Sequence, residues 1–258
     1  MKSLVVRNLA LVQDAPEDRR FNFEVSSGEI VVVLGRNGSG KSLLVSCLAG
    51  QRVSHGASVK VCGHEVFHPK SRPSALALLG VMFQHPGLLR TLSVFDNVAL
   101  PFLQNSLGLS GHLAELVGLR LDLLGCGHLA EMGSEALGEG DKRCVALARA
   151  LSGTTRFLIA DEPAAALSSE TRARVEDLLT VLVGRGALDG AILCTQDLEF
   201  ALRVGTRFLF LSNPDPATEA IGGVREERTA ATLFNHPHPP EISAFLSRRK
   251  EWQDETSL

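Results

Sequence analysis

The octapeptide GRNGSGKS, from Gly35 to Ser42, narrows the possible folds of this chain more than any other feature. It satisfies the pattern G-x-x-x-x-G-K-[ST] in full, follows the apolar run EIVVVL and leads into a segment with the pattern of a helix, Lys41 to Leu48. Such a turn points backbone N–H groups and the positive end of a helix at phosphate oxygens. The sequence therefore predicts a strand, a loop and a helix that together bind a nucleoside triphosphate.

Each part of this loop has an expected role in binding phosphate. The glycines let the backbone turn its N–H groups inward, the Lys41 ammonium reaches the β- and γ-phosphates, and the Ser42 hydroxyl holds Mg²⁺. The alternative is a glycine-rich turn without a ligand, which the complete motif between a strand and a helix disfavours. The expected nucleotide-binding residues of this segment are Gly35, Arg36, Asn37, Gly38, Ser39, Gly40, Lys41, Ser42 and Leu43.

A second motif, RFLIADEP, places two acids at the end of another apolar strand. Asp161 is positioned to hold Mg²⁺, usually through a water molecule, and Glu162 is positioned to polarise the water that attacks the phosphate. Adjacent acids at the end of a strand are otherwise a solvated turn. Beside a phosphate-binding loop, the pattern favours a metal ligand and a catalytic carboxylate.

Strand and helix patterns alternate along the chain, which is typical of an α/β fold with a mostly parallel sheet covered on both faces. The expected strands are 3–12, 21–25, 29–35, 57–63, 79–83, 156–161, 190–195 and 206–212. The first two of them are expected to form an antiparallel piece. The expected helices are 41–48, 92–102, 111–125, 137–151, 169–183 and 197–203. We expect a nucleotide-binding core from residues 1–83 and 152–225, a helical subdomain from residues 84–151, and a polar C-terminal extension from residues 226–258.

Composition disfavours several classes of protein. The chain has 258 residues and a formal net charge of −3, which argues against nonspecific binding of nucleic acid. Its five cysteines include no CxxC pair, which fits a reducing compartment, and the histidines His64, His68 and His85 are expected in loops without a metal. The N-terminus is charged too early for a signal peptide, and no run approaches the ~18 apolar residues of a membrane span. We therefore expect a soluble cytoplasmic protein that could dock on a membrane partner.

The motifs follow the order and spacing of the ATP-binding-cassette (ABC) ATPases, which the chain resembles over nearly its whole length. The resemblance rests on Gly35–Ser42, a lone Gln84 after the strand VMF, the stretch LGEGDKRCVALARAL and the segment FLIADEP. It implies a P-loop NTPase fold with ATP as substrate and Mg²⁺ as cofactor, the metal being held by Ser42, Gln84 and Asp161. It also implies a dimer in which each ATP lies between the phosphate loop of one subunit and the signature segment of the other.

The signature segment departs from the family pattern Leu-Ser-Gly-Gly-Gln. The residues that would act in trans are Leu137, Gly138, Glu139, Gly140 and Asp141, with Gly138, Glu139 and Asp141 in place of Ser, Gly and Gln. A carboxylate about 6 Å from a phosphate charge costs about 3 kcal/mol at an effective dielectric of about 20, whereas an acid in the first turn of a helix gains only about 0.3–1 kcal/mol. Either these acids point away from the nucleotide, or the composite site that uses this segment is weak.

Two further positions depart from the family. The segment 165–168 reads AALS and lacks the acid of Ser-Ala-Leu-Asp, and Gln196 stands where the family has a histidine that contacts the γ-phosphate. Gln196, which we assign with Glu162 to catalysis, can donate a hydrogen bond but carries no charge. The stretch from Arg7 to Arg20 contains no aromatic residue, so the usual base-stacking ring is also missing. Phe21 and Phe23 are the remaining candidates, but their alternating spacing favours core positions. These departures predict slow hydrolysis with ATP binding retained.

The stretch GVMFQHPGLLRTLSVFDNVALPF resembles the ATPase subunit of MCE-type (Mla-type) phospholipid transporters, which carry a comparable FDNVA-P helix at the face that docks onto the permease. The tail NHPHPPEISAFLS is similar to the ending of that group, so Ile242 and Trp252 would be anchors on a neighbouring ATPase, with a frayed terminus as the alternative. The resemblance implies an integral-membrane permease, a second ABC ATPase in a homodimer or heterodimer, and an MCE substrate-binding protein reached through the permease. The location would be the cytoplasmic face of the inner membrane.

Other functions stay open. A nucleotide-binding regulatory or structural subunit that scarcely hydrolyses ATP is favoured by Gly138, Glu139, Asp141 and Gln196, whereas Glu162 favours an ATP-driven engine. ATPases of lipoprotein exporters and solute importers share parts of the pattern. An ABC protein that acts on nucleic acid fits poorly, because the sequence has neither a long coiled-coil insert nor a basic surface.

Overall fold

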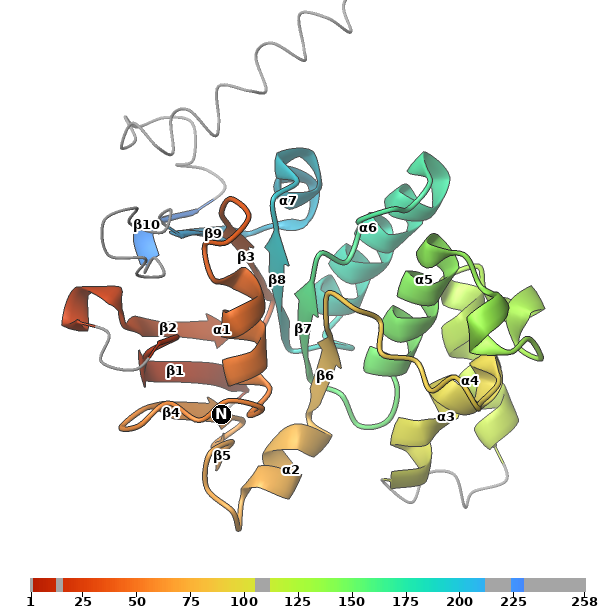
Figure 1. Cartoon of the computed structure of the whole chain (residues 1–258), viewed down its shortest axis with the longest axis horizontal. Helices are drawn as coiled ribbons and strands as arrows, with labels where there is room; N and C mark the ends of the chain where they lie inside the picture. Colours follow the sequence, from red (N-terminus) through yellow and green to blue (C-terminus); the bar gives the residue numbers. More distant parts are fainter. Residues whose placement is uncertain (1, 13–15, 105–111, 212–223, 230–258) are drawn as a thin grey trace, which may run out of the picture.

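The computed structural model of the chain describes residues 2–12, 16–104, 112–211 and 224–229. Its central sheet has the strand order β10 (Val224–Thr229), β9 (Arg207–Leu211), β3 (Glu29–Leu34), β8 (Gly190–Thr195), β7 (Phe157–Asp161) and β6 (Leu79–Met82) (Figure 1). All neighbouring strands pair in parallel except β10, which runs antiparallel to β9 at one edge. The expected α/β fold with a mostly parallel sheet is confirmed.

A second, antiparallel sheet has the order β2 (Phe21–Ser26), β1 (Ser3–Leu9), β4 (Ser58–Val61) and β5 (His64–Glu65). The pairing of β1 with β2 confirms the antiparallel N-terminal piece. Phe21 and Phe23 of β2 are buried, which confirms them as core residues. The expectation that His64 lies in a loop is wrong, because it belongs to the short strand β5.

Both faces of the central sheet are covered because successive side chains of a strand point to opposite sides. On one side, Val33 of β3 shares a core cluster with Leu44 of α1 (Lys41–Leu48) and with the antiparallel sheet. On the other side, Val32 shares a second cluster with the remaining long helices. The continuous apolar run EIVVVL therefore forms a strand that is buried on both faces.

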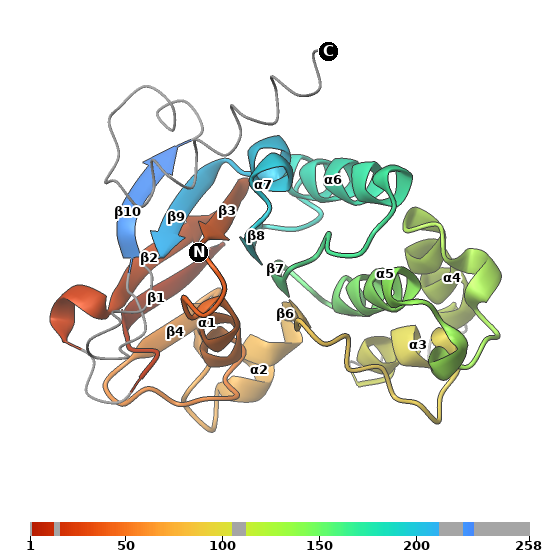
Figure 2. The same ribbon diagram turned by 45° about the horizontal axis from the view of Figure 1, so that its top comes forward.

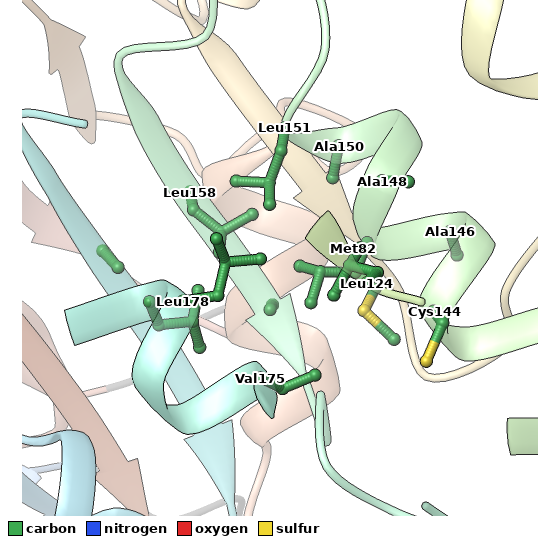
Figure 3. Packing of buried hydrophobic residues seen from close by; sticks show 14 of the residues in the cluster. Met82, Leu124, Cys144, Ala146, Ala148, Ala150, Leu151, Leu158, Val175 and Leu178 are labelled. Carbon is green, nitrogen blue, oxygen red and sulfur yellow. The ribbon is translucent and has the colours of Figure 1, made fainter. Parts of the chain in front are cut away.

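The described residues between β6 and β7 contain no strand. They form α3 (Val94–Gln104), α4 (Leu113–Leu123) and α5 (Glu139–Ala150), which lie together at one end of the molecule, while α6 (Ser169–Gly184) and α7 (Leu198–Val204) follow β7 and β8 (Figure 2). Figure 3 shows side chains of α5 packed with Met82 of β6, Leu158 of β7 and Leu178 of α6. The helical part thus shares a core with the sheet, and the domain division at residues 83/84 and 151/152 stays a prediction.

Several boundaries differ from those expected. Helix α2 (Arg72–Ala77) has no counterpart in the sequence analysis, and α5 begins at Glu139 rather than at residue 137. Strand β10 crosses the expected boundary between core and C-terminal extension, whereas the segment 242–252 lies outside the described residues. Within the described ranges, no helix combines the length and the apolar character that crossing a membrane requires.

Candidate active site

The loop between β3 and α1 is shaped by glycines in left-handed backbone conformations. Gly38 has φ 82° and Gly40, the N-cap of α1, has φ 103°, a region that residues with a side chain rarely adopt. At Gly35 a Cβ atom would lie 2.5 Å from the Ser39 hydroxyl oxygen, so Ser39 can pack this closely only because residue 35 has no side chain. These positions explain why the loop needs glycine at its turns.

Lys41 lies at the start of α1 with its ammonium group turned back over the loop. Its Nζ donates hydrogen bonds to the carbonyl oxygens of Gly35 at 2.7 Å and Arg36 at 3.1 Å, and the side chain is buried. Ser39 contributes a buried hydroxyl with no hydrogen-bond partner among the described residues. The loop therefore places the positively charged Lys41 ammonium and the unpaired Ser39 hydroxyl two residues apart in the sequence.

Three oxygen-bearing side chains meet beside the loop. The Ser42 hydroxyl donates to Gln84 Oε1 at 3.3 Å, and Asp161, the last residue of β7, lies beside it. Burial raises the pKa of the Asp161 carboxyl, while the neighbouring Ser42 hydroxyl and the charge of Lys41 oppose this rise. Hydroxyl, amide and carboxylate oxygens suit a hard cation such as Mg²⁺. The donor set thus fits the metal that the sequence motifs imply.

Glu162 follows β7 in a strained backbone conformation, with φ 50°. Its N–H donates to the carbonyl of Cys194 at 2.8 Å, and its own carbonyl accepts from Arg143 Nη1 at 3.0 Å. Both carboxylate oxygens accept hydrogen bonds from the end of β8, Oε2 from the Thr195 hydroxyl at 2.8 Å and Oε1 from the Gln196 N–H at 3.0 Å. Burial is the main cause that raises the pKa of this carboxyl.

These groups surround a cavity of about 290 Å³. It is lined by Asn37, Gly38, Gly40, Lys41, Ser42, Leu43, Gln84, Asp161 and Glu162. All of them were expected to bind nucleotide, to hold a metal or to act in catalysis, and the fold brings them together from three separate segments of the chain. Their roles toward a ligand stay predictions. The expected Mg²⁺ ligands are thus a mixed set of hydroxyl, amide and carboxylate oxygens. A metal site built from three or more His, Cys, Asp or Glu side chains does not occur within the described part of the chain.

The expected signature residues do not line this cavity. Gly138 is the N-cap of α5, and Leu137 is buried just before it. Glu139 is exposed and pairs with Lys142 at 2.9 Å, and Asp141 is exposed as well. In both Figure 1 and Figure 2, α5 and α1 lie on opposite sides of β6 and β7. If the signature residues contact a nucleotide, that nucleotide is bound to another subunit.

Gln196, the other expected catalytic residue, contacts the site through its backbone. Its side chain is exposed, and only its N–H reaches Glu162. Asp197, the next residue, forms an ion pair with Arg172 of α6, a residue that none of the sequence motifs includes. The only local signal was the spacing of Arg172 and Glu176, an i, i+4 pair on one helix face.

Comparison with known proteins gives consistent matches. The family model described as "ABC transporter" matches residues 19–165. A taurine import ATP-binding protein of Sinorhizobium fredii is 36% identical over 210 residues, covering 78% of this chain and 72% of the relative. A phosphonates import ATP-binding protein of Hyphomonas neptunium is 32% identical over 240 residues, covering 89% and 84%. An aliphatic sulfonates import ATP-binding protein of Burkholderia cenocepacia is 36% identical over 193 residues, covering 75% and 67%.

A solved structure supports the fold. A dimeric ATP-binding cassette in a post-hydrolysis state, bound to ADP and Pi, superposes with a TM-score of 0.77 at 22% identity and covers 88% of this chain and 98% of its own. The sequence relatives carry the names of import proteins for small solutes, so they do not support the expectation of an MCE-type phospholipid transporter.

Proposed function

The chain belongs to the ABC transporter family and is an ATPase of that family, and from this premise we propose that it powers a membrane permease that imports a small solute. The observation that carries the ATP-hydrolysing part of the proposal is the cavity beside α1, which joins the Lys41 ammonium, a cluster of oxygen ligands and the Glu162 carboxylate. This combination suits the binding and hydrolysis of ATP with Mg²⁺, which would neutralise charge on the phosphate oxygens when bound.

The residues divide the work by their chemistry. The Lys41 ammonium, now held by two loop carbonyls, would turn to the β- and γ-phosphates. Ser42, Gln84 and Asp161 would hold Mg²⁺. Glu162, fixed by hydrogen bonds to both carboxylate oxygens, would accept a further hydrogen bond from the attacking water, since each oxygen has a second lone pair.

A second ATPase subunit, identical or different, completes the proposal. Leu137 to Asp141 lie outside the chain's own cavity, so they would act on the nucleotide of a partner subunit. Glu139 and Asp141 would then bring negative charge toward a phosphate, and Gln196 offers no cationic side chain. We infer reduced hydrolysis, and a regulatory subunit that closes on ATP without turnover is the second candidate that these residues favour.

A groove along β6, the edge strand of the central sheet, suits a permease segment. It has a volume of about 580 Å³ and lies between α2, β6, α3 and the end of α5. Its apolar wall includes Leu76, Val81, Leu100 and Pro101. We propose that a short cytoplasmic helix of the permease occupies it, which would hold the chain at the cytoplasmic face of the inner membrane. Gln84 lies two residues after the end of β6 and would connect this groove with the nucleotide.

The import of small solutes, rather than lipid transport, rests on the named relatives. The test is to purify the full chain with its membrane partners, reconstitute the complex in vesicles and measure ATP-driven uptake of labelled taurine and of an alkanesulfonate. Uptake that the substitution Lys41→Ala abolishes, together with labelled ATP binding, supports the proposal. Undiminished ATP binding by Lys41→Ala overturns the nucleotide site, and movement of phospholipid without solute uptake overturns the import function.

A further inference from the structure

We propose that Arg172 is a positioning residue for ATP hydrolysis, which holds the segment Thr195–Asp197 so that this segment orients Glu162. The inference deepens the proposed function, because it rests on Glu162 as the group that polarises water. Arg172 lies on α6 and does not line the cavity. It therefore acts through its neighbours and touches neither nucleotide nor metal.

A chain of hydrogen bonds leads from Arg172 through Asp197 to Glu162. Its first part is the two-point contact between the Arg172 guanidinium and the Asp197 carboxylate. Nη2 donates to Asp197 Oδ1 at 3.0 Å, and Nη1 lies 2.7 Å from Oδ2. Nε donates to Glu176 Oε1 at 2.9 Å, and the Glu176 side chain is buried. Glu199 Oε2 lies a further 3.6 Å from Nη2. A planar guanidinium held by three carboxylates has little freedom to rotate, so the Asp197 carboxylate is fixed relative to α6.

The second part of this chain of hydrogen bonds leads from Asp197 to the Glu162 carboxylate. The Asp197 N–H donates to the Thr195 hydroxyl at 3.0 Å, and this hydroxyl donates to Glu162 Oε2 at 2.8 Å. The Gln196 N–H between them donates to Oε1 at 3.0 Å. Asp197 also caps α7 by accepting from the Phe200 N–H at 3.0 Å. A shift of Asp197 would thus displace the adjacent Gln196 N–H and break the hydrogen bond that orients the Thr195 hydroxyl, the two donors that hold Glu162.

Thr195 is buried and held by the pairing of β8 with β3, but Gln196 and Asp197 follow the strand and have few other anchors. The Gln196 side chain is exposed and makes no hydrogen bond within the described ranges. Without Arg172, Asp197 would keep its cap on α7, which is a short helix, but would lose its link to the long helix α6. Because displacements of about 1 Å at a catalytic group reduce rates by up to about 10²-fold, the loss of this link should appear in turnover.

The kinetic test compares Arg172→Ala and Arg172→Lys with a matched control, Arg203→Ala. Arg203 belongs to the same charge cluster, pairing with Glu199 at 2.9 Å and Glu176 at 3.5 Å, but no contact joins it to Asp197. We expect Arg172→Ala to lower kcat for Mg-ATP hydrolysis by about 10- to 100-fold with KM changed less than about twofold. Arg172→Lys should recover part of kcat, because an ammonium can hold one Asp197 oxygen, and Arg203→Ala should match the wild type.

Hydrogen–deuterium exchange of the purified full chain tests the positioning without activity. Arg172→Ala should accelerate exchange of the Gln196 and Asp197 amides, and Arg203→Ala should not. If the alanine variant fails to fold, Arg172→Lys and Arg172→Gln give the same comparison, with exchange slower in the lysine variant. Equal kcat in wild type and Arg172→Ala, a change in KM alone, or unchanged exchange would overturn the inference. A wild-type chain that binds no ATP would instead overturn the proposed function and leave the exchange result to decide the role of Arg172.

Discussion

Among single residues, Glu162 gives the most direct test of hydrolysis, because we propose that its carboxylate polarises the attacking water. Glu162→Gln keeps the length of the side chain and an oxygen that can accept from Thr195 or Gln196. It removes the negative charge that would polarise water, so we expect kcat to fall by about 10²–10⁴-fold with ATP affinity retained. Phosphate release and binding of labelled ATP measure the two quantities. A variant with wild-type turnover would show that another group activates the water.

The signature segment offers a second test at the residue scale. Gly138 has φ −66° and ψ 163°, and an added Cβ would meet its nearest atom, Asp141 Oδ2, at 3.6 Å, so serine fits without strain. Replacing Gly138, Glu139 and Asp141 together by Ser, Gly and Gln removes two carboxylates and adds a phosphate-binding hydroxyl. We expect turnover to rise by about three- to tenfold, which corresponds to about 0.6–1.4 kcal/mol.

The control for this triple variant is Glu135→Gln, which removes an exposed carboxylate that pairs with Arg90 at 3.6 Å just before the segment. A rise of equal size in this control would mean that general surface charge, not the signature geometry, limits hydrolysis. No rise in the triple variant, measured in the assembled complex, would remove the electrostatic explanation of slow turnover.

The residues that line the cavity could be picked out from the sequence because most of them belong to short motifs with fixed spacing, while their roles toward a ligand stay predictions. Gly35 to Leu43 are contiguous, and Asp161 and Glu162 are adjacent at the end of a strand. The support behind the cavity was not predictable in this way. Arg172 and Asp197 are 25 residues apart, on α6 and at the N-cap of α7, and only the packing of these two helices brings them together.

At the scale of elements, the contact between β6 and α5 leaves no room for a side chain at Gly80. A Cβ atom there would lie 1.9 Å from the carbonyl oxygen of Ala150, the last residue of α5. Gly80→Ala should therefore push α5 from the sheet and lower the free energy of unfolding by about 1–3 kcal/mol, the usual cost of overpacking. Urea denaturation followed by circular dichroism gives this value.

Gly118→Ala is the matched control, because Gly118 lies inside α4 with no atom within 4 Å of an added Cβ. Alanine is the better helix former, so this variant should be unchanged or more stable by up to about 1 kcal/mol. If both variants behave alike, β6 and α5 can separate at no cost.

Helices and strands could be predicted from the sequence where local residues fix their ends or bury a regular set of apolar side chains. Helix α1 has the expected bounds, because the glycine loop fixes its start and a continuous apolar pattern fixes its length. Helix α2 was missed, since RPSALA begins with a proline at its first turn and buries only Ala75, which gives no apolar period to detect. Strand β5 pairs through two residues and gives no signal along the sequence.

At the scale of the whole molecule, nucleotide binding would tie together segments that are distant in the chain. Ser42, Gln84 and Asp161 come from α1, from the segment after β6 and from β7, so a ligand held by all three opposes unfolding of the entire core. At about 100 times Kd, a ligand adds about 2.7 kcal/mol to stability. For a chain of this size we expect Mg-ATP to raise Tm by about 5–10 °C, and ATP with excess EDTA to raise it less.

The substitution Ser42→Ala measures the contribution of the metal to the stabilisation by Mg-ATP. It removes one oxygen ligand, so the difference between the Tm shifts with Mg-ATP and with ATP plus EDTA should shrink or vanish, while the shift with ATP alone stays. Ser46→Ala is the matched control: Ser46 lies one turn later on α1 and only donates to the Ser42 carbonyl at 3.0 Å. It should keep the full magnesium-dependent difference. If Ser42→Ala also keeps it, the cation is held elsewhere, and the oxygen cluster at the cavity stabilises only the empty fold.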